Sequence, residues 1–141
     1  MGQLAPEPRQ VNICVDTNVL LRAIVDDNPK QARIASKLLR EADAVHIPLV
    51  CICEFAWVLR SRYGFTTPDI YRAISTLLNS SNVFFDQEAA EAGLAAMREG
   101  YDFADAVIMH QGYGLGGETF MSFDKDAVAF AHKQGLKAKL L

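Results

Sequence analysis

The sequence has 141 residues, half of them hydrophobic and 22% charged, which predicts one folded domain and excludes a disordered chain. No apolar run approaches the roughly twenty residues of a membrane-spanning helix, and the first ten residues lack the apolar core of a signal peptide, so we expect a cytoplasmic protein that does not enter the membrane. The net charge of −3 excludes a chain whose overall field attracts polyanions, although a divalent cation bound in an acidic cleft would reverse the sign locally.

Short apolar runs alternate with helical patterns from residue 11 onward. Residues 1–10 contain Pro6 and Pro8 and are predicted to be a flexible leader, which leaves 11–141 as a single domain. The first half is predicted to contain, in order, a strand at 11–15, a helix ending near Val25, a helix capped by Asn28 with Pro29 at its first position, a strand at 44–47, a helix from Pro48 to Tyr63, and a helix that Thr67 and Pro68 open and that reaches Leu78.

The second half continues the alternation. It is predicted to contain a strand at 82–85, a helix at 87–99, a helix from 102 or 103 to about 113, a glycine-rich break at 112–117, a strand at 119–123, a helix at 125–134 with Gly135 at its end, and a strand at 137–140. Strands that alternate with helices predict an α/β fold, with a parallel sheet, right-handed crossovers and helices on both faces.

Two acids directly follow predicted strands. Asp16 comes after the first strand and Asp124 after the strand at 119–123, so both are expected at the carboxyl edge of the sheet. Asp105 is expected in the first turn of a helix that enters the core. Each acid alone also fits an ordinary helix cap, and that is our interpretation of Asp102; Asp126 is expected to face solvent.

Glu54 is the acid that is hardest to explain as structural. Its helical neighbours at three and four residues are all apolar, which predicts that its own face of the helix is buried; they are Val50, Cys51, Trp57 and Val58. A carboxylate that faces a core costs several kcal/mol unless a cation or hydrogen-bond donors meet it. The alternative is a structural salt bridge.

The acids suggest a metal when they are considered together. If the two strands that precede Asp16 and Asp124 are neighbours, their carboxylates lie close, and two such charges about 4 Å apart repel by roughly 4 kcal/mol at an effective dielectric of 20. Oxygen ligands without Cys or His at ligand spacing favour Mg²⁺ or Mn²⁺ over zinc. The odd set of Cys14, Cys51 and Cys53 argues against disulfides, and we interpret these cysteines as small buried hydrophobic residues.

The order of these motifs resembles PIN-domain ribonucleases, and most closely the VapC-type toxins of toxin–antitoxin pairs. The motifs are Asp16-Thr17-Asn18, Glu54 within an apolar helix, the segment 102–106 (DFADA) and the segment 122–126 (SFDKD). The resemblance covers nearly everything after the leader. It implies a three-layer fold whose five-stranded parallel sheet has the order 3-2-1-4-5, which makes strands one and four neighbours.

The resemblance also implies roles for individual residues. Asp16, Glu54, Asp105 and Asp124 would be the catalytic, metal-binding acids, with Asn18 and Ser122 as supporting polar residues and Asp126 as an accessory acid. We add Asp102 to the supporting residues on the strength of its expected helix cap, not of the resemblance. The sequence departs from the family pattern in its longer leader and in Ala127, where an aromatic residue often stands. Neither departure affects the four acids.

The resulting hypothesis is an endoribonuclease that uses one or two Mg²⁺ or Mn²⁺ ions to activate water, with RNA as substrate, a small antitoxin as partner and a homodimer as assembly. One alternative is a phosphatase or phosphate-accepting domain that uses Asp16, against which Asn18 argues because a second aspartate usually stands there. Another is an inactive PIN domain that acts as a binding module. The helix residues Phe55, Trp57 and Val58 are interpreted first as core, and second as a dimer or antitoxin surface.

Overall fold

The computed structural model describes residues 10–141, so the predicted leader, apart from Gln10, lies outside the described residues. The strands and helices predicted from the sequence are all present in this part of the chain, with ends that differ by a few residues. They are β1 (Asn12–Cys14), α1 (Thr17–Ile24), α2 (Pro29–Glu41), β2 (Ala44–His46), α3 (Leu49–Ser61), α4 (Thr67–Leu78), β3 (Val83–Phe84), α5 (Gln87–Arg98), α6 (Phe103–Gly114), β4 (Phe120–Ser122), α7 (Lys125–Lys133) and β5 (Ala138–Leu140).

Capping residues set where the helices begin. The side-chain oxygen of Asn28 accepts the amide of Gln31 at 3.1 Å, with Pro29 at the first helical position, as predicted. At α4 the prediction was wrong by one residue, because the cap is Thr66. Its hydroxyl accepts the amide of Asp69, whose carboxylate in turn accepts the amide of Thr66, and this reciprocal pair fixes the start of the helix.

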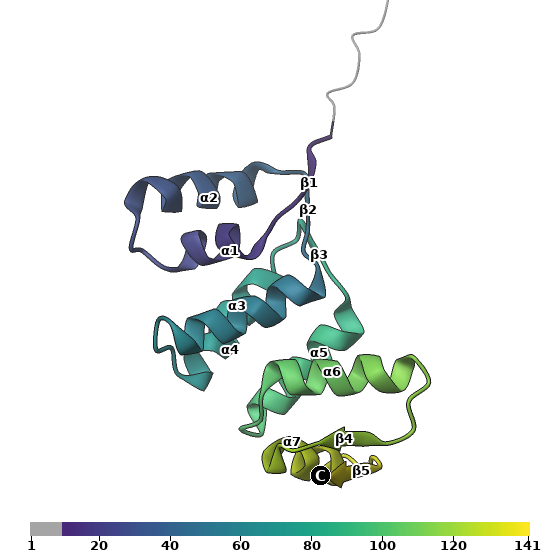
Figure 1. The fold of residues 1–141 in the computed structure, drawn as a ribbon. Coiled ribbons are helices and arrows are strands. Elements are labelled where there is room, and N and C mark those ends of the chain that lie inside the picture. Colours follow the sequence, from purple (N-terminus) through teal and green to yellow (C-terminus); the bar gives the residue numbers. More distant parts are fainter. Residues whose placement is uncertain (1–9) are drawn as a thin grey trace, which may run out of the picture.

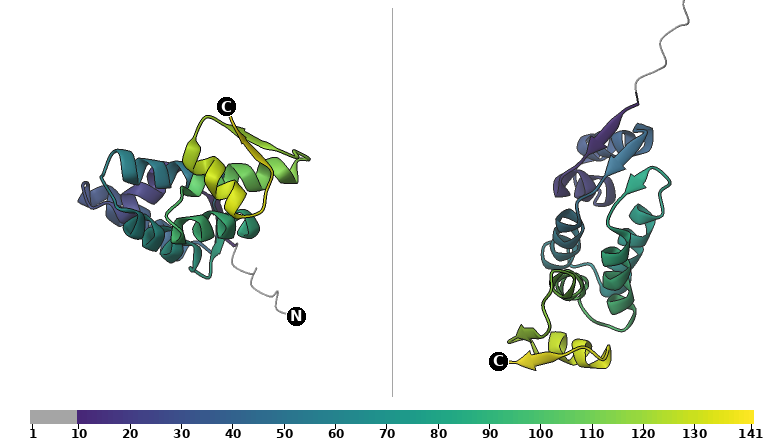
Figure 2. Two further views of the ribbon diagram at one scale, coloured as in Figure 1. Left: turned by 90° about the horizontal axis from the view of Figure 1, so that it is seen from below. Right: turned by 90° about the vertical axis from the view of Figure 1, so that its right-hand side faces the viewer.

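The strands form two separate parallel sheets. One has the order β1-β2-β3, in register at Ile13 with Val45, and the other pairs β4 with β5, in register at Met121 with Lys139. Figures 1 and 2 show these sheets at opposite ends of the molecule. The α/β class and the parallel pairing are therefore confirmed, whereas the continuous five-stranded order 3-2-1-4-5 is wrong for this structure.

The separation of the sheets follows from the presence of two cores. The larger core is built around α3 and includes the fully buried Phe55, Leu59 and Ile74. The smaller core consists of buried residues from α5, α6 and α7, namely Ala96, Ala106, Met109, Ala127, Phe130 and Ala131. The unit β4–α7–β5 (residues 120–140) buries its apolar side against α5 and α6, so β4 does not reach β1.

Helices α5 and α6 make the closest packing contact of this region. A Cβ built on Gly93 would lie 2.4 Å from the ring of Phe103, which is the first residue of α6. Only a glycine leaves room for this ring, so the contact fixes the start of α6, where Asp102 and Asp105 lie.

Among residues 10–141, none of the helices has both the length and the apolar character needed to cross a bilayer.

Candidate functional site

Four acids line one pocket between α6 and α7. Asp102 and Asp105 come from the start of α6, and Asp124 and Asp126 come from the start of α7. The pocket has a volume of about 190 Å³, and Arg60 also lines it. Asp102 and Asp124 cap their helices, which explains locally why both acids lie at the rim of the pocket.

Asp105 is the acid whose ionisation this pocket changes most clearly. Burial, then the carboxylate of Asp102, then that of Asp124 raise the pKa of Asp105 to about 6. A second and a third negative charge act on a half-buried carboxyl, which therefore holds a proton more tightly than an ordinary aspartate. Such an arrangement favours any cation that reaches the pocket, because the cation relieves this repulsion.

Hydrogen bonds hold Asp124 in place. Its Oδ1 accepts the amides of Asp126 at 2.9 Å and Ala127 at 3.2 Å, while its own amide donates to the hydroxyl of Ser122 at 2.9 Å. Within the described residues these bonds occupy one carboxylate oxygen and leave the other for a ligand. The expected supporting role of Ser122 thus has a structural basis, because its hydroxyl orients the backbone that carries Asp124.

Asp16 lies in the other half of the molecule. It follows β1 and caps α1, where its Oδ1 accepts the amide of Val19 at 3.3 Å, and both Asp16 and Asn18 are exposed. Neither residue lines the pocket of Asp105. The expected juxtaposition of Asp16 with Asp124 is absent from this structure, because β1 and β4 belong to different sheets.

Glu54 is exposed, so the prediction that its face of α3 is buried was wrong. Val50 and Trp57 on the same face are 71% and 66% exposed, since no other element packs over them in the described structure. The apolar neighbours that suggested a core therefore form a surface. Of the three residues for which core was the first interpretation, Phe55 is fully buried, Val58 partly buried and Trp57 exposed.

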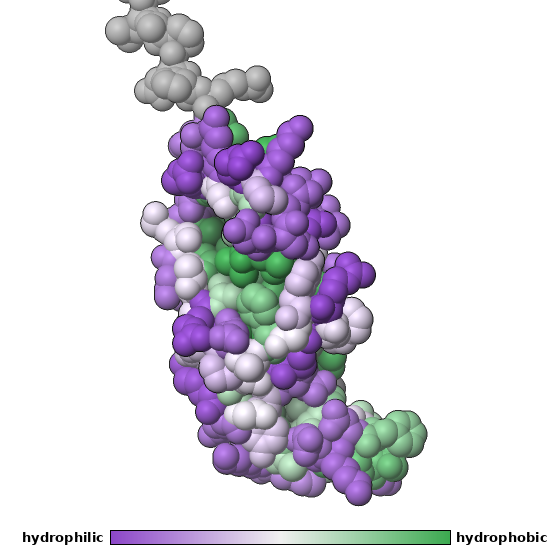
Figure 3. Space-filling view, turned by 90° about the vertical axis from the view of Figure 1, so that its left-hand side faces the viewer, coloured by the Kyte–Doolittle hydropathy of each residue, from purple (hydrophilic) through white to green (hydrophobic). Residues whose placement is uncertain are grey.

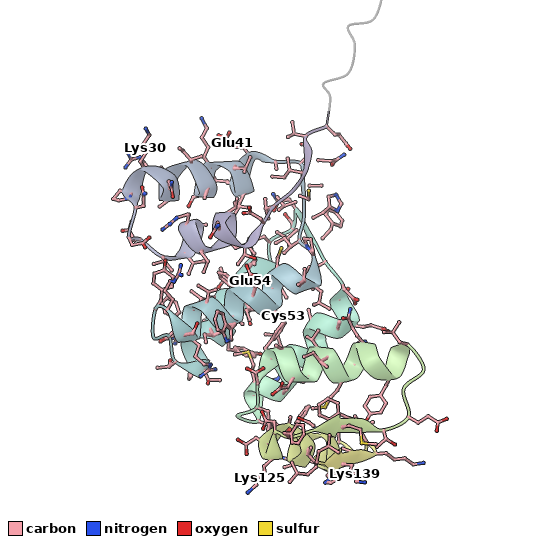
Figure 4. All side chains as sticks on the ribbon, viewed as in Figure 1. Lys30, Glu41, Cys53, Glu54, Lys125 and Lys139 are labelled. Atoms are coloured by element: carbon pink, nitrogen blue, oxygen red, sulfur yellow. The ribbon has the colours of Figure 1, made fainter. Side chains whose placement is uncertain are left out.

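The cysteines differ from one another more than the sequence predicted. All three are free, as expected, but Cys14 is exposed and only Cys51 and Cys53 are partly buried. Burial and then the carboxylate of Asp102 raise the pKa of the Cys53 thiol to about 11, so this thiol stays protonated. Figure 4 shows Cys53 and Glu54 leaving α3 in different directions, with Cys53 on the side of α6.

The pocket has the type of side chain that binds a divalent cation, but in this structure these side chains are not close enough together to bind one. Its carboxylate oxygens are the ligands that Mg²⁺ and Mn²⁺ prefer. Within residues 10–141, however, no three Asp, Glu, His or Cys side chains are grouped closely enough to hold one ion. The structure brings Asp105 and Asp124 to one pocket and leaves Asp16 and Glu54 outside it.

Arg60 and Thr67 are site residues that the sequence did not reveal. Both line the acidic pocket, and the guanidinium of Arg60 donates to the hydroxyl of Thr67 at 3.0 Å. Within the described residues no carboxylate forms a salt bridge with Arg60. No spacing in the sequence indicates this position, because it results from the packing of α3 against α6, with the end of α3 and the start of α4 at the pocket.

Comparison with known proteins identifies the family. The family model described as PIN domain matches residues 13–134, a range that extends from β1 to the end of α7 and includes Asp16, Glu54, Asp105 and Asp124 but not β5. No curated protein matches the chain. Since the match spans most of the sequence, the chain belongs to the PIN domain family, whose members are generally metal-dependent nucleases.

Proposed function

We propose that this protein is an endoribonuclease that depends on Mg²⁺ or Mn²⁺. The observation that carries the proposal is the convergence of Asp105 and Asp124 on one pocket, in a chain that belongs to the PIN domain family. The raised pKa of Asp105 supports it, because the pocket concentrates negative charge that a divalent cation would neutralise.

The proposed ligands are Asp105 and Asp124, which share the pocket, and Asp16 and Glu54, which lie outside it in this structure and would have to be brought to it. Asn18, Ser122 and Asp126 would support them. A bound divalent cation would supply an activated water and would offset charge on the scissile phosphate. Ser122 would keep Asp124 in position through its hydrogen bond to the Asp124 amide. The acids thus serve to bind metal, and the proposal needs no side-chain nucleophile.

Positive side chains provide the expected contacts with RNA. Arg60 lies in the acidic pocket, where a phosphate that approaches the metal ligands would meet its guanidinium. Helix α2 adds four exposed cations, which we call the α2 stripe: Lys30, Arg33, Lys37 and Arg40. Their spacing of three, four and three residues places them on one face of α2, so the stripe can follow a phosphate backbone even though the net charge of the chain is negative.

We further propose that the enzyme is the toxin of a toxin–antitoxin pair, silenced by a small protein partner. The support is the likeness of its motifs at Asp16 to Asn18, 102–106 and 122–126 to VapC-type toxins. Expression of the chain alone should arrest growth, and co-expression with the product of an adjoining reading frame should relieve the arrest. Growth that is unaffected by expression of an active nuclease would contradict the toxin role and would leave the ribonuclease proposal intact.

A cleavage assay tests the enzymatic proposal. Pure protein should cut single-stranded RNA with Mn²⁺ and stop when EDTA is added, and Asp105→Asn or Asp124→Asn should lower the rate by about 100-fold or more. Glu91→Gln changes an exposed acid of α5 outside the pocket and should cut normally. Equal cleavage by Asp105→Asn, or trapping of a phosphoaspartate at Asp16, would overturn the proposal in favour of another chemistry.

A further inference from the structure

Each sheet in the described structure has two edge strands, and the edges that concern us are those of β1 and β4, the strands that lead directly into Asp16 and Asp124. β1 pairs only with β2, and β4 pairs only with β5, so each presents a row of backbone donors and acceptors without a strand partner in the described structure. Both strands have three residues, and both are paired in parallel with their one neighbour. Free edges of this kind are templates for pairing with another chain.

The surfaces beside these edges are unusually apolar. On the β4 side, Met121 is 54% exposed and Phe123 is 81% exposed. Figure 3 shows hydrophobic residues exposed at the lower end of the molecule, where β4 and β5 lie. In the other half, Val11, which directly precedes β1, is also more than half exposed. Burial of these side chains would contribute about 25 cal/mol per Å² of apolar area, so the surfaces favour a protein partner.

The acids are divided between the same two parts of the chain. β1 leads into Asp16, which is two residues after Cys14, and β4 leads into Asp124, which is two residues after Ser122. If β1 and β4 paired in parallel with Cys14 opposite Ser122, the two carboxylates would lie opposite each other at one edge of the sheet. The partner that completes the strand pair therefore also completes the acid set.

Contacts with α5 and α6 hold the unit β4–α7–β5 away from β1 of its own chain. While these contacts persist, a β4 strand that pairs with β1 has to come from another molecule. Phe130 packs on Tyr101 with ring centroids 4.9 Å apart, and Lys133 pairs with Glu99 at 3.7 Å. Ala127 and Phe130 are buried in the smaller core with residues of α5 and α6. Closure within one chain would pull this unit out of its core, whereas association with a second copy leaves the core intact.

We propose that two copies of this chain associate by parallel pairing of β4 of one copy with β1 of the other, so that each active site combines Asp16 and Glu54 of one copy with Asp105 and Asp124 of its partner. The active-site part of this proposal rests on the proposed nuclease function, but the strand pairing does not. A two-fold axis makes the two pairings equivalent, so the dimer is closed and has two sites. The free edges of β1 and β4 are used up in both copies, and β3 and β5 remain as the edge strands of each completed sheet.

The native cysteine in β1 gives a direct test of the pairing. Cys14 is exposed, and Ser122→Cys would place a second thiol opposite it at the roughly 5 Å spacing of paired strands, within the range for a disulfide. Mild oxidation of S122C should give a covalent dimer in which peptide mapping finds Cys14 of one chain joined to residue 122 of the other. The double variant C14S/S122C should stay uncrosslinked and controls for Cys51 and Cys53.

Any other crosslinking result would contradict the pairing of β1 and β4 between two copies. A link between positions 14 and 122 within a single chain would show closure of the monomer and overturn the proposal, and so would the absence of any link in a folded S122C. The wild-type chain provides a second measurement without a substitution, since light scattering should give the mass of a dimer. A monomer at about 100 μM would overturn the proposal, because the shared active site exists only in the dimer and high protein concentration favours association.

Mixed variants test the shared active site. Asp16→Asn and Asp124→Asn keep their helix caps, because asparagine caps as well as aspartate, and each should be inactive alone. After the two are unfolded and refolded together, half of the dimers are mixed and each mixed dimer has one intact site, so about a quarter of the wild-type activity should return. No recovery with an active wild type overturns the shared site. An inactive wild type refutes the proposed function instead, and leaves the crosslink to decide the pairing.

Discussion

Asp105 of α6 and Asp124 of the α7 cap face the same pocket, although they belong to different elements and the strand β4 lies between them in the chain. The charge of Asp124 is one of the causes that raise the pKa of Asp105, after burial and the charge of Asp102. The ionisation of Asp105 therefore reports on whether the negative charge of the pocket is neutralised. This relationship makes pH a direct probe of the site.

We expect the pocket to reduce the stability of the metal-free protein as pH rises through 6. The pKa of Asp105 is about 6 in the folded chain and 3.8 as its ordinary value, so the folded state holds the proton more tightly. The stabilising effect of that proton is fully present below about pH 4 and is lost as pH increases through 6. Asp105→Asn should remove this loss, and thermal unfolding measured from pH 4 to 7.5 should show a flatter profile for the variant.

The matched control is Asp126→Asn, an exposed acid of the same pocket that is not among the causes of the Asp105 shift. Its pH profile should follow that of the wild type.

Mn²⁺ should raise the unfolding temperature of the wild type more at pH 7 than at pH 5, because protons compete with the cation for Asp105. An equal effect of Mn²⁺ at both pH values would contradict this account of the pocket.

Arg60 should contribute to RNA affinity more than a cation elsewhere on the same helix end. Removal of a charge-assisted contact costs about 1.5–3 kcal/mol, so Arg60→Gln should weaken RNA binding by roughly 10-fold or more. Arg62→Gln is the control, because Arg62 is exposed near the end of α3 but does not line the pocket. Binding is measured by fluorescence anisotropy with Ca²⁺ in place of Mn²⁺, and equal losses in both variants would refute a specific role for Arg60.

Local signals in the sequence were sufficient for the elements but not for their assembly. Asn28 before Pro29 and the acids that follow β1 and β4 are short-range patterns, and the structure has helix starts at each of them. The five-stranded sheet and the buried face of Glu54 depended on which surfaces meet over a long range. A sequence does not distinguish an apolar residue in the core from one, such as Trp57, that is exposed on a surface.

The same limit applies to the site. Asp102 and Asp105 lie three residues apart, so their shared helix start was predictable from spacing alone. Arg60 reaches the pocket because α3 packs against α6, and no periodicity indicates such a contact. The close fit of Gly93 to Phe103 was equally hidden, since a glycine in an alanine-rich helix has no visible role until the opposing ring is placed.

That fit leads to a prediction about stability. A methyl group at position 93 would collide with the ring of Phe103, so Gly93→Ala should destabilise the protein by about 1–3 kcal/mol and shift the start of α6. Gly112→Ala is the matched control in α6, because a Cβ there meets nothing within 4 Å and alanine favours helix by about 1 kcal/mol. Urea unfolding measures both changes, and a neutral Gly93→Ala would show that the ring is free to move aside.

The α2 stripe should make RNA binding depend on salt. Each phosphate contact contributes about 0.7 to the slope of log affinity against log salt for a single strand, so Arg33→Gln with Lys37→Gln should lower that slope by roughly 1 to 1.5. Figure 4 shows that Lys139 lies at the opposite end of the molecule from Lys30, which makes the exposed pair Lys137→Gln and Lys139→Gln a control of equal charge. If the control pair changes the slope as much as the α2 pair does, RNA is attracted by net charge and does not follow α2. If only the α2 pair changes it, the backbone runs along this helix, and cleavage at low salt should fall in proportion to the lost affinity.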